Sequence, residues 1–90
     1  MRSYDEPIQV LFGDAPRQFI WRGRLLLVKE VQGRWLRSTA WWRHPEPGAR
    51  GLPQELEVWR VEAGNGLHRG VYELARPVGE QDWVLQGMWD

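Results

Sequence analysis

Turn-forming residues divide the chain into short apolar runs. The turn-like segments are 13–16, 22–23, 32–33, 45–53, 64–66 and 77–79, and each contains Gly or Pro. The runs between them are roughly five to nine residues long and rich in Val, Ile, Leu, Trp and Tyr, which is the length and composition of β-strands. No run has a strong 3.6-residue period. The pattern therefore predicts strands at 8–12, 17–21, 24–31, 35–37, 55–63, 69–76 and 83–89.

Alternation within these runs indicates how the strands are covered. In the 55–63 run, Leu56 and Val58 oppose Trp59 and Val61, so this strand is apolar on both faces and is expected at the centre of the sheet. A tight hairpin is expected at 21–24, where Gly23 supplies a positive φ. Two further hairpins should close around 64–66 and 77–79.

These features predict an all-β fold: a single small antiparallel meander, as a twisted sheet or open barrel of about six to seven short strands. Residues 1–90 are expected to form a single domain, with a flexible N-terminus over 1–6 and a long loop over 43–54.

Tryptophan changes this picture, because the chain of 90 residues contains seven. A domain of this size buries only roughly 60–65% of the surface of its unfolded chain on folding. A buried Trp contributes about 150–250 Å² to that burial. With no Cys, neither a disulfide nor a thiolate zinc site can compensate for a small core. The expected core residues are Phe19, Trp21, Trp35, Trp59, Val61, Tyr72, Leu74, Trp83, Leu85 and Trp89.

Charge is balanced, with 12 basic and 12 acidic residues, which disfavours strong non-specific binding to nucleic acid. All the basic residues except Lys29 are Arg, the side chain that stacks on aromatic rings and forms forked contacts. The sequence has neither a signal-peptide pattern nor an apolar window near the ~20 residues of a membrane span. A cytoplasmic protein is expected.

Catalytic patterns are weak. His44 and His68 lie far apart, so no metal site or cofactor is expected. Ser38 has no base near it in the sequence, and Glu55 with Glu57 is better explained as solvated strand residues than as an acid–base pair. The sequence therefore predicts a protein that is not an enzyme.

The strongest candidate for a binding site is the pair Trp41-Trp42. Two consecutive side chains of a strand cannot both point inward, so at least one of these rings should be exposed. Together with Arg37, Arg43 and Arg50 they would form a cationic, stacking patch. Such a patch suits either a protein partner or single-stranded nucleic acid.

Aromatic, Arg and Gly residues recur in a distinctive order over nearly the whole chain. They comprise the segments 4–8, 19–24, 57–62 and 70–74, with Trp35, Trp41, Trp42, Trp83, Leu85, Trp89 and Asp90. This order resembles a family of small proteins of unknown function found mostly in actinobacteria.

The second half is also similar to the C-terminal segment of the ImuB family, inactive relatives of Y-family polymerases in a bacterial mutagenic-repair complex. The matching residues are Trp35, Trp41, Trp42, Arg60, Gly70, Tyr72, Leu74, Trp83 and Asp90. Arg43 replaces an expected acidic residue, Trp89 replaces Tyr, and the polymerase-like body is absent. The resemblance implies a non-enzymatic adaptor in translesion synthesis or DNA damage tolerance. Its partner would be a polymerase or a repair accessory protein, with weak contact to single-stranded DNA as the alternative.

Overall fold

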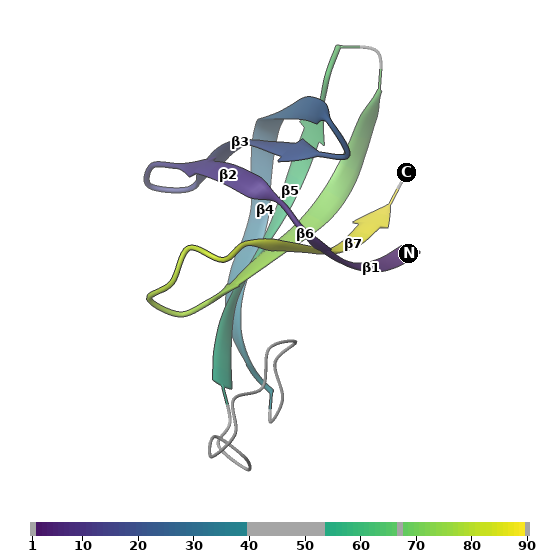
Figure 1. Cartoon of the computed structure of the whole chain (residues 1–90). Helices are drawn as coiled ribbons and strands as arrows, with labels where there is room; N and C mark the ends of the chain where they lie inside the picture. Colours follow the sequence, from purple (N-terminus) through teal and green to yellow (C-terminus); the bar gives the residue numbers. More distant parts are fainter. Residues whose placement is uncertain (1, 40–53, 67, 90) are drawn as a thin grey trace.

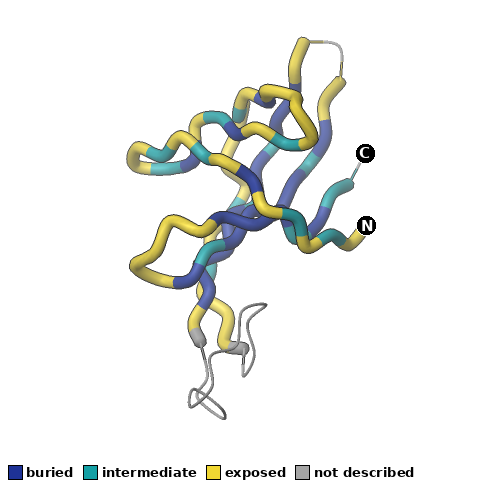
Figure 2. Tube along the Cα trace, in the orientation of Figure 1, coloured by how far each residue is buried: buried dark blue, intermediate teal, exposed yellow. Residues whose placement is uncertain are grey.

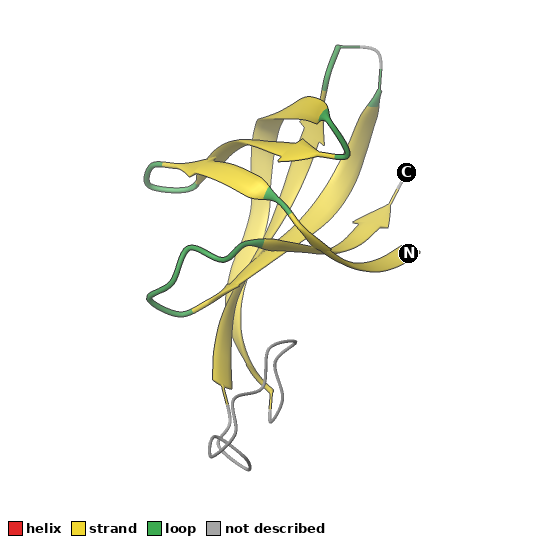
Figure 3. Ribbon diagram, viewed as in Figure 1, coloured by secondary structure: helices red, strands yellow, loops and turns green. Residues whose placement is uncertain are grey.

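The computed structural model describes residues 2–39, 54–66 and 68–89, and in these segments it contains strands and no helix (Figures 1 and 3). The strands are β1 (Arg2–Pro7), β2 (Gln9–Phe12), β3 (Pro16–Trp21), β4 (Arg24–Thr39), β5 (Gln54–Gly64), β6 (Arg69–Pro77) and β7 (Val84–Trp89). All pairings are antiparallel, which confirms the predicted all-β architecture. No helix in the described ranges is long and apolar enough to cross a membrane.

The strands form one sheet in the order β1-β7-β6-β5-β4-β3-β2. Strands β2 to β7 are thus a meander, whereas β1 pairs with β7 at the far edge. Only Ile8 separates β1 from β2, so residues 2–12 connect the two edges of the sheet, as the purple strand in Figure 1 shows. Ile8 is buried, and its N–H donates to the carbonyl of Trp83 at 3.1 Å. The sheet is therefore strongly curled into an open half-barrel.

Strand β1 corrects the expectation of a flexible terminus over 1–6. Residues Arg2–Pro7 pair with β7, with Arg2 opposite Met88 and Pro7 opposite Val84. The segment is polar, so no local hydrophobic pattern marks it as a strand; its pairing depends on an edge that the far end of the chain supplies. The predicted long loop over 43–54 lies outside the described residues, except that β5 begins at Gln54.

Strand β4 corrects a second expectation, the break between 24–31 and 35–37. It is one strand of 16 residues with register shifts between Val28 and Glu30 and between Val31 and Gly33. Each shift marks a β-bulge, which bends a strand and increases its twist without ending it. Gly33 therefore lies at a bend, opposite Arg60, where a turn was predicted.

Strand β5 occupies the middle of the sheet and is covered on both faces, as its sequence predicts. On the inner face, Trp59 and Val61 belong to the main core, which also includes the buried Ile8, Phe19, Leu26, Ala63, Tyr72, Leu74, Trp83 and Leu85. On the other face, Leu56, Val58 and Ala75 form a second cluster under Trp35. Figure 2 shows burial concentrated along β5, β6 and β7, with β2 and β3 more exposed.

Candidate interaction surfaces

The predicted core residues fall into two groups. Phe19, Trp59, Val61, Tyr72, Leu74, Trp83 and Leu85 are buried, and Trp21, Trp35 and Trp89 are half-buried. The three half-buried rings all contact arginines: Trp21 contacts Arg22, and Trp35 and Trp89 both contact Arg60.

The first Trp–Arg cluster surrounds Glu57 on the inner face. Arg34 Nε donates to Glu57 Oε2 at 2.9 Å, Arg76 Nε donates to Oε1 at 3.0 Å, and Trp59 Nε1 donates to Oε2 at 3.0 Å. Burial raises the pKa of Glu57, but the hydrogen bonds from Arg34 and Arg76 outweigh it, so the pKa lies below its ordinary value. Glu57 is therefore an ionised structural anchor.

Arg76 extends this cluster toward both sides of the sheet. Its Cζ lies 4.4 Å from the ring centroid of Phe12 and 4.7 Å from that of Trp83. Since Phe12 lies on β2 and Trp83 directly precedes β7, one guanidinium joins elements from both sides of the curled sheet. Cation–π contacts of this kind are worth about 0.5–2 kcal/mol each.

The second cluster joins β1 to the β3–β4 hairpin. Glu6 accepts hydrogen bonds from Trp21 Nε1 at 2.9 Å and from Arg22 Nη2 at 2.6 Å, and these bonds, Arg22 first, lower its pKa. Arg22 has a φ of 52° and Gly23 a φ of 74°, which confirms the predicted tight turn. The Arg22 guanidinium stacks 4.8 Å from Trp21 and 5.2 Å from Tyr4.

The third cluster lies on the outer face. Arg60 Nη2 donates to Glu73 Oε2 at 2.8 Å, and its Cζ lies 5.4 Å from the Trp35 ring and 4.7 Å from the Trp89 ring. Arg60 Nε is buried and makes no hydrogen bond. The Trp35 and Trp89 rings thus hold the Arg60 side chain in place although its Nε has no hydrogen-bond acceptor among the described residues.

Arg34-Trp35 on β4 and Trp59-Arg60 on β5 are adjacent Trp–Arg pairs in the sequence. Each Trp of these pairs stacks with the Arg of the other strand and not with its own neighbour. Arg34 lies opposite Trp59 and stacks on it at 5.6 Å on the inner face. The next residue, Trp35, stacks with Arg60 on the outer face. Alternation along each strand places one stack on each side of the sheet, so these adjacencies stabilise the fold.

The predicted partner-binding patch is only partly described. Trp41, Trp42, Arg43 and Arg50 lie outside the described residues. Arg37 is exposed, and its Nη2 donates to Gln86 Oε1 at 2.6 Å, which connects β4 with β7. The use of this patch for a protein or for single-stranded nucleic acid remains a prediction.

A different surface is exposed on β2, β3 and the start of β4. Leu11 is 57% exposed, Ile20 43%, Leu25 47% and Leu27 40%. Ile20 pairs with Leu25, while Gln18 lies between Leu11 and Leu27; Gln9 flanks Ile20. These six side chains, Gln9, Leu11, Gln18, Ile20, Leu25 and Leu27, are named the outer apolar face. It carries no charge.

This face has a physical origin that the sequence contains. Residues 25–28 are Leu-Leu-Leu-Val, and in a strand such a run must place alternate side chains on opposite faces. Leu26 and Phe19, which pair with one another, point into the core. Leu25 and Leu27 consequently point away from it. The uninterrupted apolar run was the signal that the sequence analysis missed.

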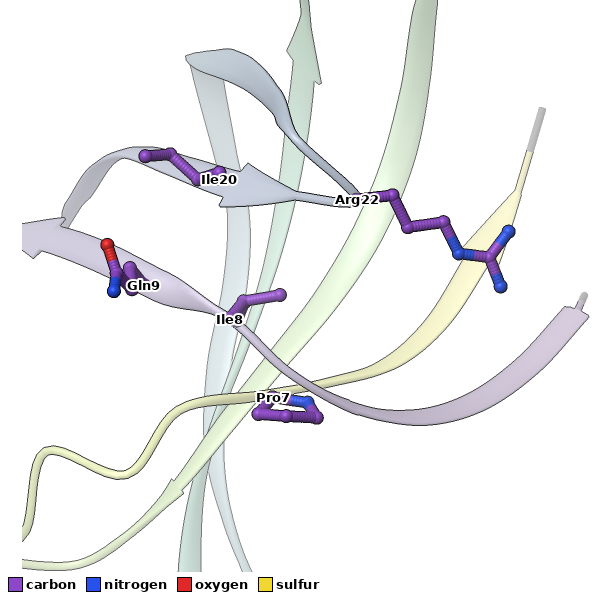
Figure 4. A pocket seen from close by; sticks show the side chains of 5 residues that line it. All are labelled: Pro7, Ile8, Gln9, Ile20 and Arg22. Carbon is purple, nitrogen blue, oxygen red and sulfur yellow. The ribbon is translucent and has the colours of Figure 1, made fainter.

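Shallow depressions follow the outer apolar face. One of about 380 Å³ lies where β1 passes into β2, and its lining is Pro7, Ile8, Gln9, Ile20 and Arg22 (Figure 4). A second, of about 220 Å³, runs between β2 and β3 and shares Gln9 and Ile20 with the first. The second depression lies on the outer apolar face, whereas the first lies at its border, where Pro7, Ile8 and Arg22 complete the lining.

The described residues do not assemble a catalytic or metal constellation. They contain no group of three or more His, Asp or Glu side chains that could hold a metal ion. Ser38 and His68 are exposed, and Glu57 is engaged by two arginines while Glu55 is exposed. His44 lies outside the described segments.

Comparison with protein families gives one match. The model of a domain of unknown function, DUF6504, matches residues 1–90. The chain belongs to this family. No curated protein and no solved structure is significantly similar to the DUF6504 chain.

Proposed function

We propose that this protein is a non-enzymatic protein-interaction module that docks a partner on the outer apolar face. The observation that supports the proposal is a contiguous group of four aliphatic side chains, each at least 40% exposed, with two amides and no charge among them. Single exposed apolar residues are common, but contiguous apolar patches on soluble domains mark interaction sites. Interface centres are likewise depleted of charged residues.

The face is also held rigid. Val10, Phe19 and Leu26 lie on the same strands and pack on the main core, so their backbone positions are fixed by buried neighbours. A partner therefore meets a preformed surface and loses little free energy in ordering it. The exposed side chains of β2, β3 and the start of β4 can form the centre of a standard or transient interface, in which a few side chains dominate the affinity.

The proposal includes the setting of this interaction. The similarity of residues 35–90 to the C-terminal segment of the ImuB family favours a partner in translesion synthesis or DNA damage tolerance, either a polymerase or a repair accessory protein. This part rests on the order of those residues, most of them aromatic.

The test is a capture experiment with the full chain from cells exposed to DNA damage. Leu25→Glu places a charge in the outer apolar face, and Val78→Glu, at another aliphatic residue that is 50% exposed, is the matched control. We expect capture of a replication or repair protein by the wild type and by Val78→Glu, and its loss with Leu25→Glu. Equal capture by both variants would refute the docking face, and recovery of no such protein would refute the setting.

A further inference from the structure

The half-barrel has a second concave feature at the end formed by the β3–β4 and β5–β6 turns. It is a depression of about 270 Å³ between β3, β4, β6 and β7. Its floor includes Leu26, which points away from the outer apolar face. The depression is therefore a separate site, and it exists only because the curling of the sheet brings non-neighbouring strands together.

The floor is aromatic and preorganised. Trp21 and Tyr72 line it with ring centroids 6.1 Å apart and an interplanar angle of 72°. The Trp21 indole is fixed by its hydrogen bond to Glu6 and by the Arg22 stack. Tyr72 is 4% exposed and its ring lies nearly perpendicular to that of Trp21, so the half-buried Trp21 ring is the surface that can meet the flat face of a nucleobase.

The rim is cationic. Arg24 lies opposite Trp21 in the β3–β4 register, so both side chains are on the same face. Arg24 has no hydrogen bond or ion pair with any described residue, and Arg69 has one ion pair, a 3.7 Å contact with Glu62. No carboxylate of the described residues lines the depression. A guanidinium without an ion pair to a described residue, as at Arg24, or with one long ion pair, as at Arg69, can still bind a phosphate.

The adjoining turn supplies a third basic side chain. His68 lines the depression, and its backbone is held by Asn65: His68 N–H donates to Asn65 Oδ1 at 3.3 Å, and Asn65 N–H donates to the His68 carbonyl at 3.2 Å. Two arginines and a histidine therefore face one opening above an aromatic floor.

We infer that this depression binds one nucleotide unit, with the base against the half-buried Trp21 ring and the phosphate at Arg24 and Arg69. The volume is just below the roughly 300 Å³ at which pockets for drug-sized ligands begin, which limits the occupant to one small unit. The unit is either a free nucleotide or a nucleotide within a single strand. This site is independent of the docking function proposed above.

Isothermal titration calorimetry of the full chain tests the inference with dAMP, adenosine, inorganic phosphate and a short oligodeoxyadenylate. We expect dAMP to bind more tightly than adenosine or phosphate, and Arg24→Gln and Arg69→Gln each to weaken it by about tenfold or more. Arg17→Gln, which removes the same charge from an exposed position outside the depression, should leave the affinity unchanged. Unchanged melting temperatures would show that the variants fold.

Three outcomes decide against the site. Absence of dAMP binding refutes it, equal affinity for inorganic phosphate refutes the role of the floor, and equal losses in Arg17→Gln indicate diffuse electrostatics. Tighter binding of the oligonucleotide than of dAMP identifies a single strand as the source, and the reverse identifies the free nucleotide. Leu25→Glu, which alters the outer apolar face, should retain dAMP binding. Failure of the docking proposal would therefore be distinguishable from failure of the nucleotide site.

Discussion

The strands β5, β6 and β7 form a region whose two faces are both covered, whereas β2, β3 and residues 24–28 of β4 are covered on one face only. Val58 and Leu74 are 0% exposed, although they point to opposite sides of the sheet, while Leu25 is 47% exposed beside the buried Leu26. Both regions are rich in aliphatic residues. Apolar composition alone therefore does not separate a residue that stabilises the fold from one that is available to a partner.

In the covered region, individual Trp and Arg side chains cover the outer face of the sheet. Trp35 packs over Leu56, Val58 and Ala75, and Arg60 lies between Trp35 and Trp89. Tryptophan and arginine thus replace a second sheet on this side. The outer region has no such side chains above Ile20 and Leu25 in the described part of the chain, and this difference leaves its face open.

The largest effect should come from the centre of the covered region. Trp59→Ala removes a buried ring, its hydrogen bond to Glu57 and its stack with Arg34, and we expect a loss of about 3–5 kcal/mol in the free energy of unfolding. Urea denaturation measures this. A loss below about 1 kcal/mol, comparable to that of a surface substitution, would mean that the two regions do not differ as described.

The ion-pair cluster should give the next effect. Glu57→Gln leaves Arg34 and Arg76 without their carboxylate, and we expect a loss of about 1.5–3 kcal/mol at neutral pH. Glu55→Gln, two residues away and exposed, is the matched control.

The same carboxylate should make stability depend on pH. The folded pKa of Glu57 is lowered, so its contribution is fully present above the unfolded Glu pKa of about 4.3 and is lost as the pH falls through the folded value. The wild type should therefore lose more stability than Glu57→Gln on acidification through this window. If the free energies of unfolding of the wild type and Glu57→Gln fall in parallel with pH, Glu57 is not the carboxylate responsible.

Trp35→Ala measures how much the Trp35 ring, packed over Leu56, Val58 and Ala75, contributes to stability. The ring is half-buried, so we expect a loss on the order of 1–2 kcal/mol, smaller than that of Trp59→Ala. Denaturation under the same conditions gives the comparison. A loss equal to that of Trp59→Ala would show that the outer cluster contributes as much as the main core.

The smallest effect should come from the outer apolar face. Leu25→Gln should change stability by no more than about 0.5 kcal/mol, because the side chain is already largely in water. Leu26→Gln, at the neighbouring residue, should lower the free energy of unfolding several-fold more, because Leu26 is 4% exposed. Similar losses at the two positions would mean that the outer face is covered in solution.

Local patterns predicted much of the fold. The Arg22-Gly23 turn, the hairpins around 64–66 and 77–79 and the central position of β5 all follow from turn chemistry and alternation within a few residues. The outer apolar face was also within reach of such reasoning, since Leu25, Leu26, Leu27 and Val28 cannot all face inward. Strand β1 was not, because a polar segment becomes a strand only when a distant edge accepts it.

The clusters could not be read from adjacency in sequence. Arg34 stacks on Trp59 rather than on Trp35, because the β4–β5 register, with its two bulges, decides which side chains meet. Glu6 and Arg22 likewise meet only when β1 crosses to the β3–β4 hairpin.

By itself, the sequence determined that this chain forms short antiparallel strands with tight turns and a tryptophan-rich core, because those properties depend on neighbouring residues. The tertiary structure decided which apolar face is covered and which is open, and where Arg24, Arg69 and Trp21 converge. Those outcomes depend on the pairing of β1 with β7 and on the bulges of β4, which are set by contacts between distant parts of the chain.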